Sequence, residues 1–274
     1  MSYQNFKPRI WAKAIQHELV RESVYAADCN REYEGSVQKA GDSVRILGVG
    51  KPTITKQIGG EIKLGTAETV ADTSATMVVN HIAYFNVKVD DIDKRQAQGK
   101  VLEAIMSEGN EGLTNAVDED IAALAKDKLA KKLVAQILTK DNVMDWVDAC
   151  VLALLQNDVS RKTKIFATVP PWLWMLVKNK LTEVDTDNSG RIRSMEIGNY
   201  GNVTFKCSNN CAQDGENSLP MFRTARAIAA VQPMTHVEAY RPEAGFSDAV
   251  KGFVLYEQKI VRPKELIVLP CKQG

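Results

Sequence analysis

The stretch KPTITKQIGGEIKLGTAETVADTSATMVV, residues 51–79, constrains the fold more than any other part of this sequence. Its Thr, Val and Ile content, with Gly59-Gly60 between two such runs, is typical of two β-strands joined by a tight turn. No Phe, Trp or Tyr occurs between Glu34 and Ala83. Large apolar side chains supply most of the energy of a core, and an isolated two-stranded ribbon is marginally stable in water. We therefore expect an arm that is stabilised by lying on another copy of the same protein.

Strand-like segments flank this arm on both sides. SVRILGV, at Ser43–Val49, precedes it, and IAYFNVKVDD, residues 82–91, follows it. In the second segment Phe85, Val87 and Val89 alternate with polar residues, which predicts a half-buried strand. Asp91 and Asp93 then provide N-cap chemistry for a long helical segment.

Helical spacing predicts three helical regions outside the arm. The first runs from Pro8 to about Asn30. The second carries an apolar stripe that continues to Ile137; its members are Val117, Ile121, Leu124, Leu129, Leu133 and Ile137. A bend or break is expected at the glycines of this region, which are Gly99, Gly109 and Gly112. The third region contains two helices, at about 143–155 behind a Thr139 or Asp141 cap and at about 172–181 behind Pro170-Pro171.

Strands are expected between and after these helices. Their predicted ranges are 164–169, 191–197, 202–208, 225–231, 235–239, 251–258 and 265–269, with Pro233, Pro242 and Pro263 as breaks. Long helices mixed with separated strands favour an α+β fold over a parallel βαβ array.

The bulk composition is that of an ordinary globular protein. The chain has 274 residues, 45% hydrophobic and 25% charged, and 35 basic against 34 acidic residues give a net charge of +1. Such balance gives no electrostatic signature of nucleic-acid or membrane binding. No apolar run approaches the roughly 18 residues that span a bilayer. The five cysteines are odd in number and scattered, so we expect reduced thiols.

The acidic segment DTDNSGRIRSME, residues 185–196, resembles the calcium loop of an EF-hand. Asp185, Asp187, Ser189 and Glu196 occupy ligand positions, and Gly190 stands at the turn position. The residues after the loop resemble a strand rather than the second helix that an EF-hand needs. We therefore predict no metal site and interpret the loop as a solvated helix-to-strand turn, with calcium binding as the alternative.

Other candidate chemistry is weak. Cys207 and Cys211 form CSNNC, but no histidine lies near them, so a turn is favoured over a zinc site. The basic segment KDKLAKKL, residues 126–133, is interpreted as a solvated helix face, with contact to phosphate or to an acidic partner as the alternative. There is no glycine-rich phosphate loop, zinc-protease motif or nucleophile elbow. We predict neither an enzyme nor a cofactor.

Four blocks in their order resemble the major capsid proteins of tailed bacteriophages, which have the Hong Kong 97-type fold. They are FKPRIWAKAI with NREYEG (30–35), AGDSVRI (40–46), YFNVKVDDIDKRQA (84–97) and FSDAVKGFVLYEQKIVRPKELIVL (246–269). The resemblance implies an N-arm with its helix at 1–36 and an extended loop at 49–80. It further implies a peripheral domain with a long spine helix, from 37–48, 81–140 and 236–274, and an axial domain at 141–235.

The resemblance implies a virion coat protein that self-assembles. Copies would form pentamers and hexamers of an icosahedral head that encloses double-stranded DNA without sequence-specific binding, with the extended loop lying over a neighbouring subunit. Because the chain begins almost directly with the N-arm, we expect either a separate scaffolding protein or a scaffolding segment that has been processed away, besides a portal and a decoration protein. Assembly is expected in the host bacterial cytoplasm, without a membrane. The alternatives are an encapsulin-like nanocompartment shell and a calcium-binding module built on residues 185–196.

Overall fold

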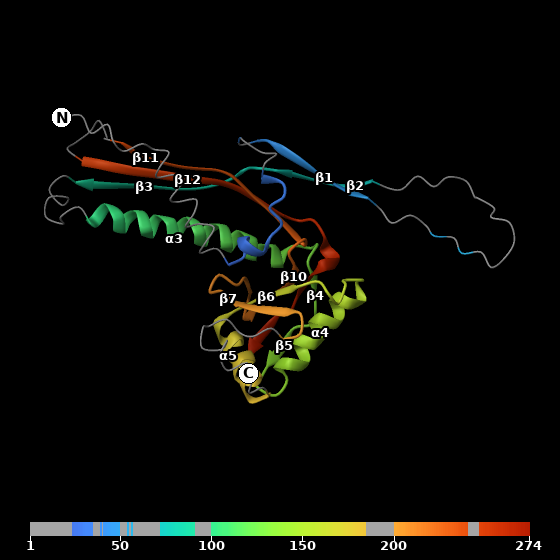
Figure 1. The fold of residues 1–274 in the computed structure, drawn as a ribbon. Helices are drawn as coiled ribbons and strands as arrows, with labels where there is room; N and C mark the ends of the chain where they lie inside the picture. Colours follow the sequence, from blue (N-terminus) through green and yellow to red (C-terminus); the bar gives the residue numbers. More distant parts are fainter. Residues whose placement is uncertain are drawn as a thin grey trace.

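The structure is a computed structural model that describes residues 24–34, 39, 41–49, 54, 56, 72–90, 100–184, 200–240 and 247–274. These residues form an α+β fold with four β-sheets, as predicted (Figure 1). None of their helices is both long and apolar enough to cross a membrane. In chain order the elements are η1 (Ala26–Asp28), β1 (Ser43–Val49), β2 (Asp72–Val78), β3 (His81–Asp90), α3 (Lys100–Ala123), η3 (Leu124–Lys126), β4 (Lys131–Lys132), β5 (Gln136–Leu138), α4 (Val143–Gln156), β6 (Ile165–Val169), α5 (Pro171–Val184), β7 (Val203–Cys207), β8 (Gln213–Asp214), β9 (Asn217–Ser218), β10 (Met221–Thr224), β11 (Ile228–Tyr240), β12 (Ser247–Ile260), η4 (Pro263–Glu265), β13 (Leu266–Val268) and β14 (Cys271–Gln273).

The longest strands form an elongated layer with α3. They pair antiparallel in the order β11–β12–β3, and α3 lies along one face of this sheet (Figure 1). On β3, Ala83 and Phe85 pack against the core beneath α3, whereas Tyr84 is 78% exposed on the opposite face. The alternation predicted for residues 82–91 is therefore confirmed over residues 82–88. That core includes Leu113, Val117, Ile121, Val250 and Val254.

The helix α3 passes through two glycines without interruption. It runs from Lys100 to Ala123 as one helix, so Gly109 and Gly112 do not break it. Gly109 has a packing reason, because a Cβ at this position would lie 3.1 Å from two ring carbons of Phe85. That distance is tighter than ordinary van der Waals contact, and glycine therefore lets the helix approach β3 closely.

A second body lies beneath this layer (Figure 1). Its five-stranded sheet has the order β4–β13–β10–β6–β7, and α4 and α5 contribute to the same core. The strand predicted at 164–169 and the helices predicted at 143–155 and 172–181 are confirmed. The shared core includes Val147, Leu154, Ile165, Ala167, Leu173 and Val177.

Asn142, and not Thr139 or Asp141, occupies the N-cap of α4. Its side-chain oxygen accepts a hydrogen bond from the Thr139 N–H at 2.8 Å, and its amide nitrogen donates to the Ile137 carbonyl at 3.1 Å. Both backbone groups adjoin β5, the outermost strand of the sheet β5–β14–β9–β8. The Asn142 amide therefore pairs backbone groups next to an edge strand, where unpaired groups are open to another chain.

The base of the predicted arm packs on its own subunit. β1 and β2 pair antiparallel from Ser43 opposite Val78 to Val49 opposite Asp72, which confirms both strands. Their buried side chains meet those of β11 and β12 in a small aliphatic core; its members are Val44, Ile46, Met77, Val79, Ala229, Val231 and Leu255. The expectation that the arm lacks any core of its own is therefore wrong for its base. The Gly59-Gly60 turn lies outside the described residues.

The helical stripe predicted from Leu129 to Ile137 is wrong. Instead η3 follows α3, and the chain continues in the short strands β4 and β5, which pair parallel with β13 and β14. Leu129 and Ile137 are 49% and 53% exposed, whereas Ala130 and Leu138 are buried. The pairing partners lie about 130 residues away in sequence, so local spacing cannot indicate them.

Two further predictions change near the chain ends. The sequence predicts a helix up to about Asn30, and the part before residue 24 lies outside the described residues. From residue 24 onward the chain forms a 3-10 turn, Ala26–Asp28, in place of the predicted helix. The two strands expected around Pro233 form one strand, β11, with an irregular register between Val231 and Met234. β11 is an edge strand of its sheet, where proline removes no ladder hydrogen bond if it sits at a bulge.

The C-terminal strands are distributed over three sheets. β12 lies at the centre of the long sheet, β13 pairs with β10 and β4 in the five-stranded sheet, and β14 pairs with β5 and β9. Residues 247–274 therefore join the elongated layer to the second body.

Candidate functional site

The predicted calcium loop lies outside the described residues. Asp185, Asp187, Ser189 and Glu196 follow the end of α5 at Val184 and precede β7. The incoming helix and the outgoing strand agree with a helix-to-strand connection. The interpretation of this loop as a turn without a metal, and the alternative of calcium binding, both stay predictions.

The CSNNC segment forms a turn after β7, as predicted. Cys207 ends the strand and is exposed, Cys211 is buried, and the Asn210 N–H donates to the Ser208 hydroxyl at 3.2 Å. Within the described ranges no three His, Cys, Asp or Glu side chains gather closely enough to hold a metal ion.

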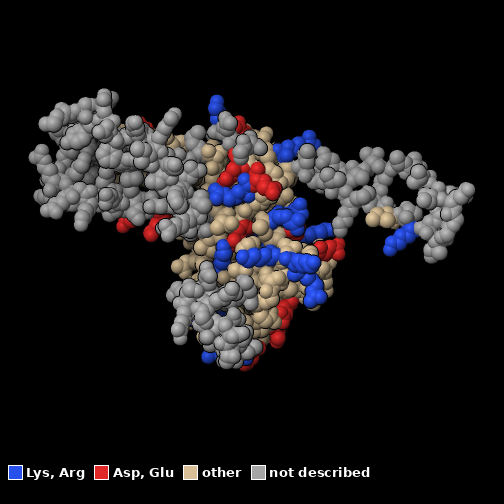
Figure 2. All heavy atoms as spheres, viewed as in Figure 1, with Lys and Arg blue, Asp and Glu red and all other residues tan. Residues whose placement is uncertain are grey.

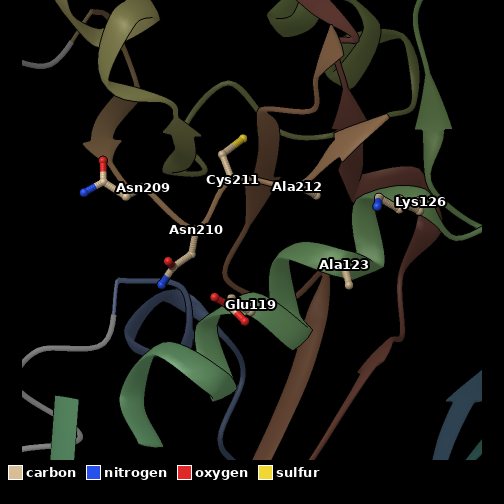
Figure 3. A pocket seen from close by; sticks show the side chains of 7 residues that line it. All are labelled: Glu119, Ala123, Lys126, Asn209, Asn210, Cys211 and Ala212. Atoms are coloured by element: carbon tan, nitrogen blue, oxygen red, sulfur yellow. The ribbon is translucent and has the colours of Figure 1, made fainter. Parts of the chain in front are cut away.

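A polar cleft of about 250 Å³ separates this turn from the end of α3 (Figure 3). Glu119 and Lys126 line one side of it, and Asn209 and Asn210 line the other. The Asn210 amide donates to Asn115 on α3 at 3.2 Å. In Figure 3 the Cys211 thiol points away from α3, and burial raises its pKa to about 11, so this thiol is protonated at neutral pH. The cleft therefore offers no activated nucleophile.

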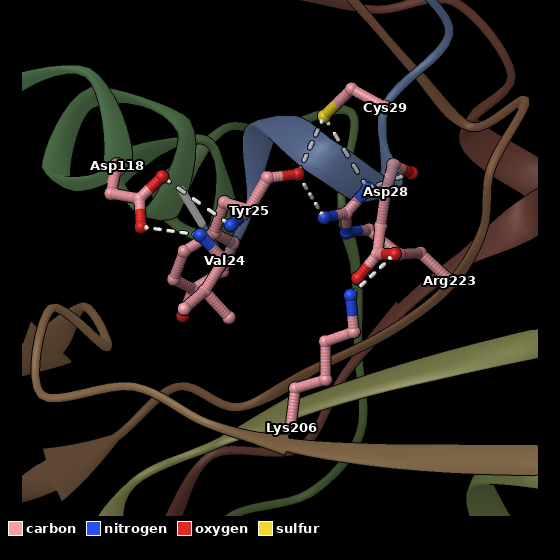
Figure 4. Close-up of polar contacts among 7 residues, drawn as sticks. All are labelled: Val24, Tyr25, Asp28, Cys29, Asp118, Lys206 and Arg223. Carbon is pink, nitrogen blue, oxygen red and sulfur yellow. Dashed lines mark hydrogen bonds and ion pairs between the residues drawn. The ribbon is translucent and has the colours of Figure 1, made fainter. Parts of the chain in front are cut away.

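A buried polar network holds the segment after residue 23 (Figure 4). Arg223 on β10 is 0% exposed, and its guanidinium donates to the carbonyl oxygens of Tyr25 and Asp28, each at 2.8 Å. The guanidinium carbon also lies 5.9 Å from the centre of the Tyr25 ring. The Tyr25 carbonyl also accepts a hydrogen bond from the Asp28 N–H at 3.2 Å within the turn, so the guanidinium is an additional, charged donor to this group.

Two further charged side chains hold the same turn. The Asp118 carboxylate on α3 accepts hydrogen bonds from the Val24 and Tyr25 N–H groups at 3.1 and 3.3 Å. The Lys206 ammonium on β7 donates to Asp28 Oδ1 at 2.8 Å. We call Asp118, Lys206 and Arg223, together with the turn that they hold, the η1 clamp. It joins α3, β7 and β10, and thus both bodies of the molecule, through one turn.

Sequence reasoning missed the η1 clamp. Its members are scattered, and Arg223 binds backbone carbonyls about 195 residues away. One signal was present: Arg223 stands within the apolar run LPMFR, and a charged residue in a buried strand requires partners.

The outer face of the long sheet, opposite α3, is only partly covered. The arm base packs over Leu255. Phe253, two residues before Leu255 on β12, lines an open groove of about 350 Å³ together with Tyr84 and His236. These three residues are cross-strand neighbours. Beside them Lys251 pairs with Glu238 at 3.1 Å and lowers the pKa of that carboxyl. The groove is thus an aromatic surface with a charged border.

Comparisons with known proteins agree with this architecture. No protein-family model and no curated protein sequence matches the chain. A structure from Mycobacterium phage Che8 matches 90% of this chain and 91% of its own, with a TM-score of 0.75 and 26% identity. The bacteriophage PhiM1 mature capsid matches 88% and 87%, with a TM-score of 0.64 and 16% identity. A virus-like particle from Pyrococcus furiosus matches 95% and 98%, with a TM-score of 0.61 and 12% identity.

These likenesses define a phage capsid fold, of mixed α+β composition with few helices and several sheets. The resemblance to the major capsid proteins of tailed bacteriophages, expected from the four sequence blocks, is confirmed.

Proposed function

We propose that this chain is the major capsid protein of a tailed bacteriophage and that its copies assemble into pentamers and hexamers of an icosahedral head. The observation that carries this proposal is the likeness to the Che8 structure over nine tenths of both chains. The function is structural, and no described cleft contains an activated nucleophile.

Within this proposal the named regions of the capsid family apply to the chain. The N-arm takes 1–36 and the extended loop 49–80. The peripheral domain takes 37–48, 81–140 and 236–274, and the axial domain takes 141–235. The long sheet and α3 support the peripheral assignment of 81–123 and 236–260, and the core formed by α4, α5 and β6 supports the axial one. The strands β4, β5, β13 and β14 depart from these bounds, because they pair within the sheets of the second body.

The arm supports a self-assembling role. Its base is held by a core, and the Lys259 ammonium on β12 donates to the Thr76 carbonyl on β2 at 2.5 Å. Ile54, further along, is 80% exposed. An exposed apolar side chain on an arm without aromatic residues gains stability by contact with another copy. The groove at Tyr84, His236 and Phe253 continues the face that the arm base already covers, and it suits a neighbour's arm.

Near-neutral charge supports a wall that encloses double-stranded DNA without binding it tightly. A scaffolding protein, a portal and a decoration protein are the further partners of this proposal, and the virion is its location, after assembly in the host cytoplasm. The particle's contents distinguish it from a nanocompartment shell, which would hold protein cargo.

Expression with the neighbouring genes, followed by electron microscopy, tests the proposal. Closed shells or capsomer rings are expected, and a protein that stays monomeric with every neighbouring gene product would contradict it. Nucleic acid extracted from particles of a phage infection supports a head, whereas a protein cargo supports a compartment.

A shortened arm sharpens this test. Deleting residues 52–69 spares the paired strands, because Val49 lies opposite Asp72. This variant should keep the thermal stability of the monomer and lose assembly. Met77→Ala is the contrasting variant: Met77 is 1% exposed in the arm base, so the variant should unfold at lower temperature. If the shortened protein unfolds like Met77→Ala, the deleted residues belong to the subunit's own core.

A further inference from the structure

The segment after α3 forms an exposed edge rich in lysine. Lys126, Lys128, Lys131 and Lys132 are exposed, and none of them forms an ion pair with another described residue. Figure 2 shows a band of Lys and Arg side chains across the middle of the molecule, at the level of β4 in Figure 1. We call residues 126–137 the lysine edge.

The lysine edge also exposes apolar side chains. Leu129, Val134 and Ile137 are 49%, 77% and 53% exposed. Lysine alone on an edge strand is an ordinary protection against association. Three large apolar side chains among the lysines do not serve that purpose, and they indicate a surface that another molecule covers.

The outer face of α3 carries the opposite charge. Glu108 and Glu111 are exposed there and form no ion pair with any described residue. Between them and the helix end lies Gly112, which is exposed, with no atom within 4 Å of the position of an added Cβ.

Gly112 has no packing explanation among the described residues. Glycine is less favourable than alanine inside a helix. Gly109 is accounted for by its contact with Phe85, but no described atom approaches Gly112. A glycine on an exposed helix face permits another backbone to come close, and a second copy could supply that backbone.

The two surfaces cannot neutralise each other within one copy. The helix from Glu108 to Ala123 alone spans about 22 Å. Exposed charges are largely screened beyond about 8 Å at physiological salt. Their complementarity is therefore available only between copies.

We propose that the lysine edge of one copy docks on the outer face of α3 of a second copy, with Lys131 and Lys132 facing Glu108 and Glu111 and with apolar side chains lying over Gly112. The partner is a second copy because the complementary charges belong to the same nearly neutral chain. The contact joins two different surfaces, so it is head-to-tail and closes a ring when the rotation permits. This docking rests on the proposed function, and it names the two surfaces through which copies of the chain self-associate.

Charge exchange between purified variants tests this docking. The variants are Lys131→Glu with Lys132→Glu, Glu108→Lys with Glu111→Lys, and all four changes together. Arg161→Glu with Lys162→Glu is the matched control, because both residues lie in an exposed turn between α4 and β6 that belongs to neither the lysine edge nor α3. Sedimentation velocity at low and physiological salt measures self-association of the full chain, and circular dichroism during heating verifies that each variant is folded.

The wild-type protein and the control should self-associate equally, and more strongly at low salt. Each double variant should weaken association at least tenfold. The quadruple variant, and an equimolar mixture of the two double variants, should regain most of it. The docking would be overturned if the quadruple variant self-associates no more strongly than the double variants. It would also be overturned if the double variants self-associate as strongly as the wild-type protein.

The outcomes separate this inference from the proposed function. If all variants form particles equally well, the capsid role is supported, and the contacts between copies are formed by other surfaces than the two proposed. Salt-sensitive oligomers that the reversals abolish, without particles under any condition, would support the docking and contradict the capsid role. DNA is the competing occupant of the lysine edge: if the lysine reversals abolish DNA retention in a gel but leave sedimentation unchanged, the docking is overturned.

Discussion

The Arg223 guanidinium and the carbonyl oxygen of Tyr25 lie 2.8 Å apart although 198 residues separate them in sequence. The donor is fully buried on β10, and the acceptor belongs to the short turn that follows residue 23. This bond, with that to Asp28, fixes the turn between the two bodies.

Arg223→Met should destabilise the subunit strongly. It removes both donors from buried carbonyl groups, which we expect to lower the free energy of unfolding by about 3 kcal/mol. Urea denaturation of the unassembled protein measures this loss. Arg226→Met is the matched control, because Arg226 is 55% exposed and reaches Glu265 at only 3.6 Å, so its effect should stay within about 0.5 kcal/mol. Equal losses in both variants would show that the η1 clamp does not stabilise the subunit.

The two glycines of α3 should respond oppositely to alanine. Gly112→Ala adds a methyl group in open space and should stabilise the unassembled subunit by about 0.5–1 kcal/mol. Gly109→Ala places a Cβ 3.1 Å from the Phe85 ring, so packed side chains must shift. The cost of this shift cancels the stability that alanine gains through its higher helix propensity. Thermal unfolding of both variants measures the difference, and equal melting temperatures would contradict the close approach of α3 to β3.

Cys207 should be the one fast-reacting thiol of the native protein. It is exposed, whereas Cys29, Cys150, Cys211 and Cys271 are buried. At pH 8 a thiol-specific reagent should modify one group per chain rapidly and the others only after unfolding. Cys207→Ser should remove the fast phase. Rapid reaction of two or more groups in the unassembled protein would contradict the burial of the remaining cysteines.

Alkaline pH should destabilise the subunit through its buried thiols. Burial raises the pKa of Cys150 and of Cys271 to about 12 and that of Cys211 to about 11, whereas unfolded thiols ionise near pH 8.5. The folded state thus keeps protons that the unfolded state releases, and stability present below about pH 8.5 is lost as pH rises towards 11–12.

Each of these thiols should contribute a slope of about 1 kcal/mol per pH unit above pH 9. Denaturant unfolding at pH 8, 9 and 10 measures this decline. Cys150→Ala should show a shallower decline than wild type, and Cys207→Ser serves as the control with an exposed thiol. An unchanged slope in Cys150→Ala would indicate that other groups cause the alkaline loss.

Local patterns predicted much of the fold. The strand at Ser43–Val49 and the alternation around Phe85 are short-range signals that burial on one face explains, and Pro171 begins α5 as its fixed backbone angle favours. The four sequence blocks led to the capsid resemblance because their order depends on the whole fold.

The failures share a physical cause, which is pairing between distant segments. Leu129, Leu133 and Ile137 have helical spacing, but their backbone pairs with β13 and β14 near the other end of the chain. Arg223 binds carbonyl groups, which any residue carries, so side-chain identity cannot indicate its partners. Gly112 looked like a helix breaker, whereas packing of the surrounding helix overrides its propensity.

The distribution of the C-terminal strands determines when the subunit can fold. β12, β13 and β14 enter three different sheets, so those sheets remain incomplete until residues 247–274 have left the ribosome. Contacts of such long sequence separation form slowly, because the intervening chain must first be ordered. A nascent chain therefore cannot present a complete contact surface to neighbouring copies before residues 247–274 have joined these sheets. Synthesis and folding of each copy thus precede its association with other copies.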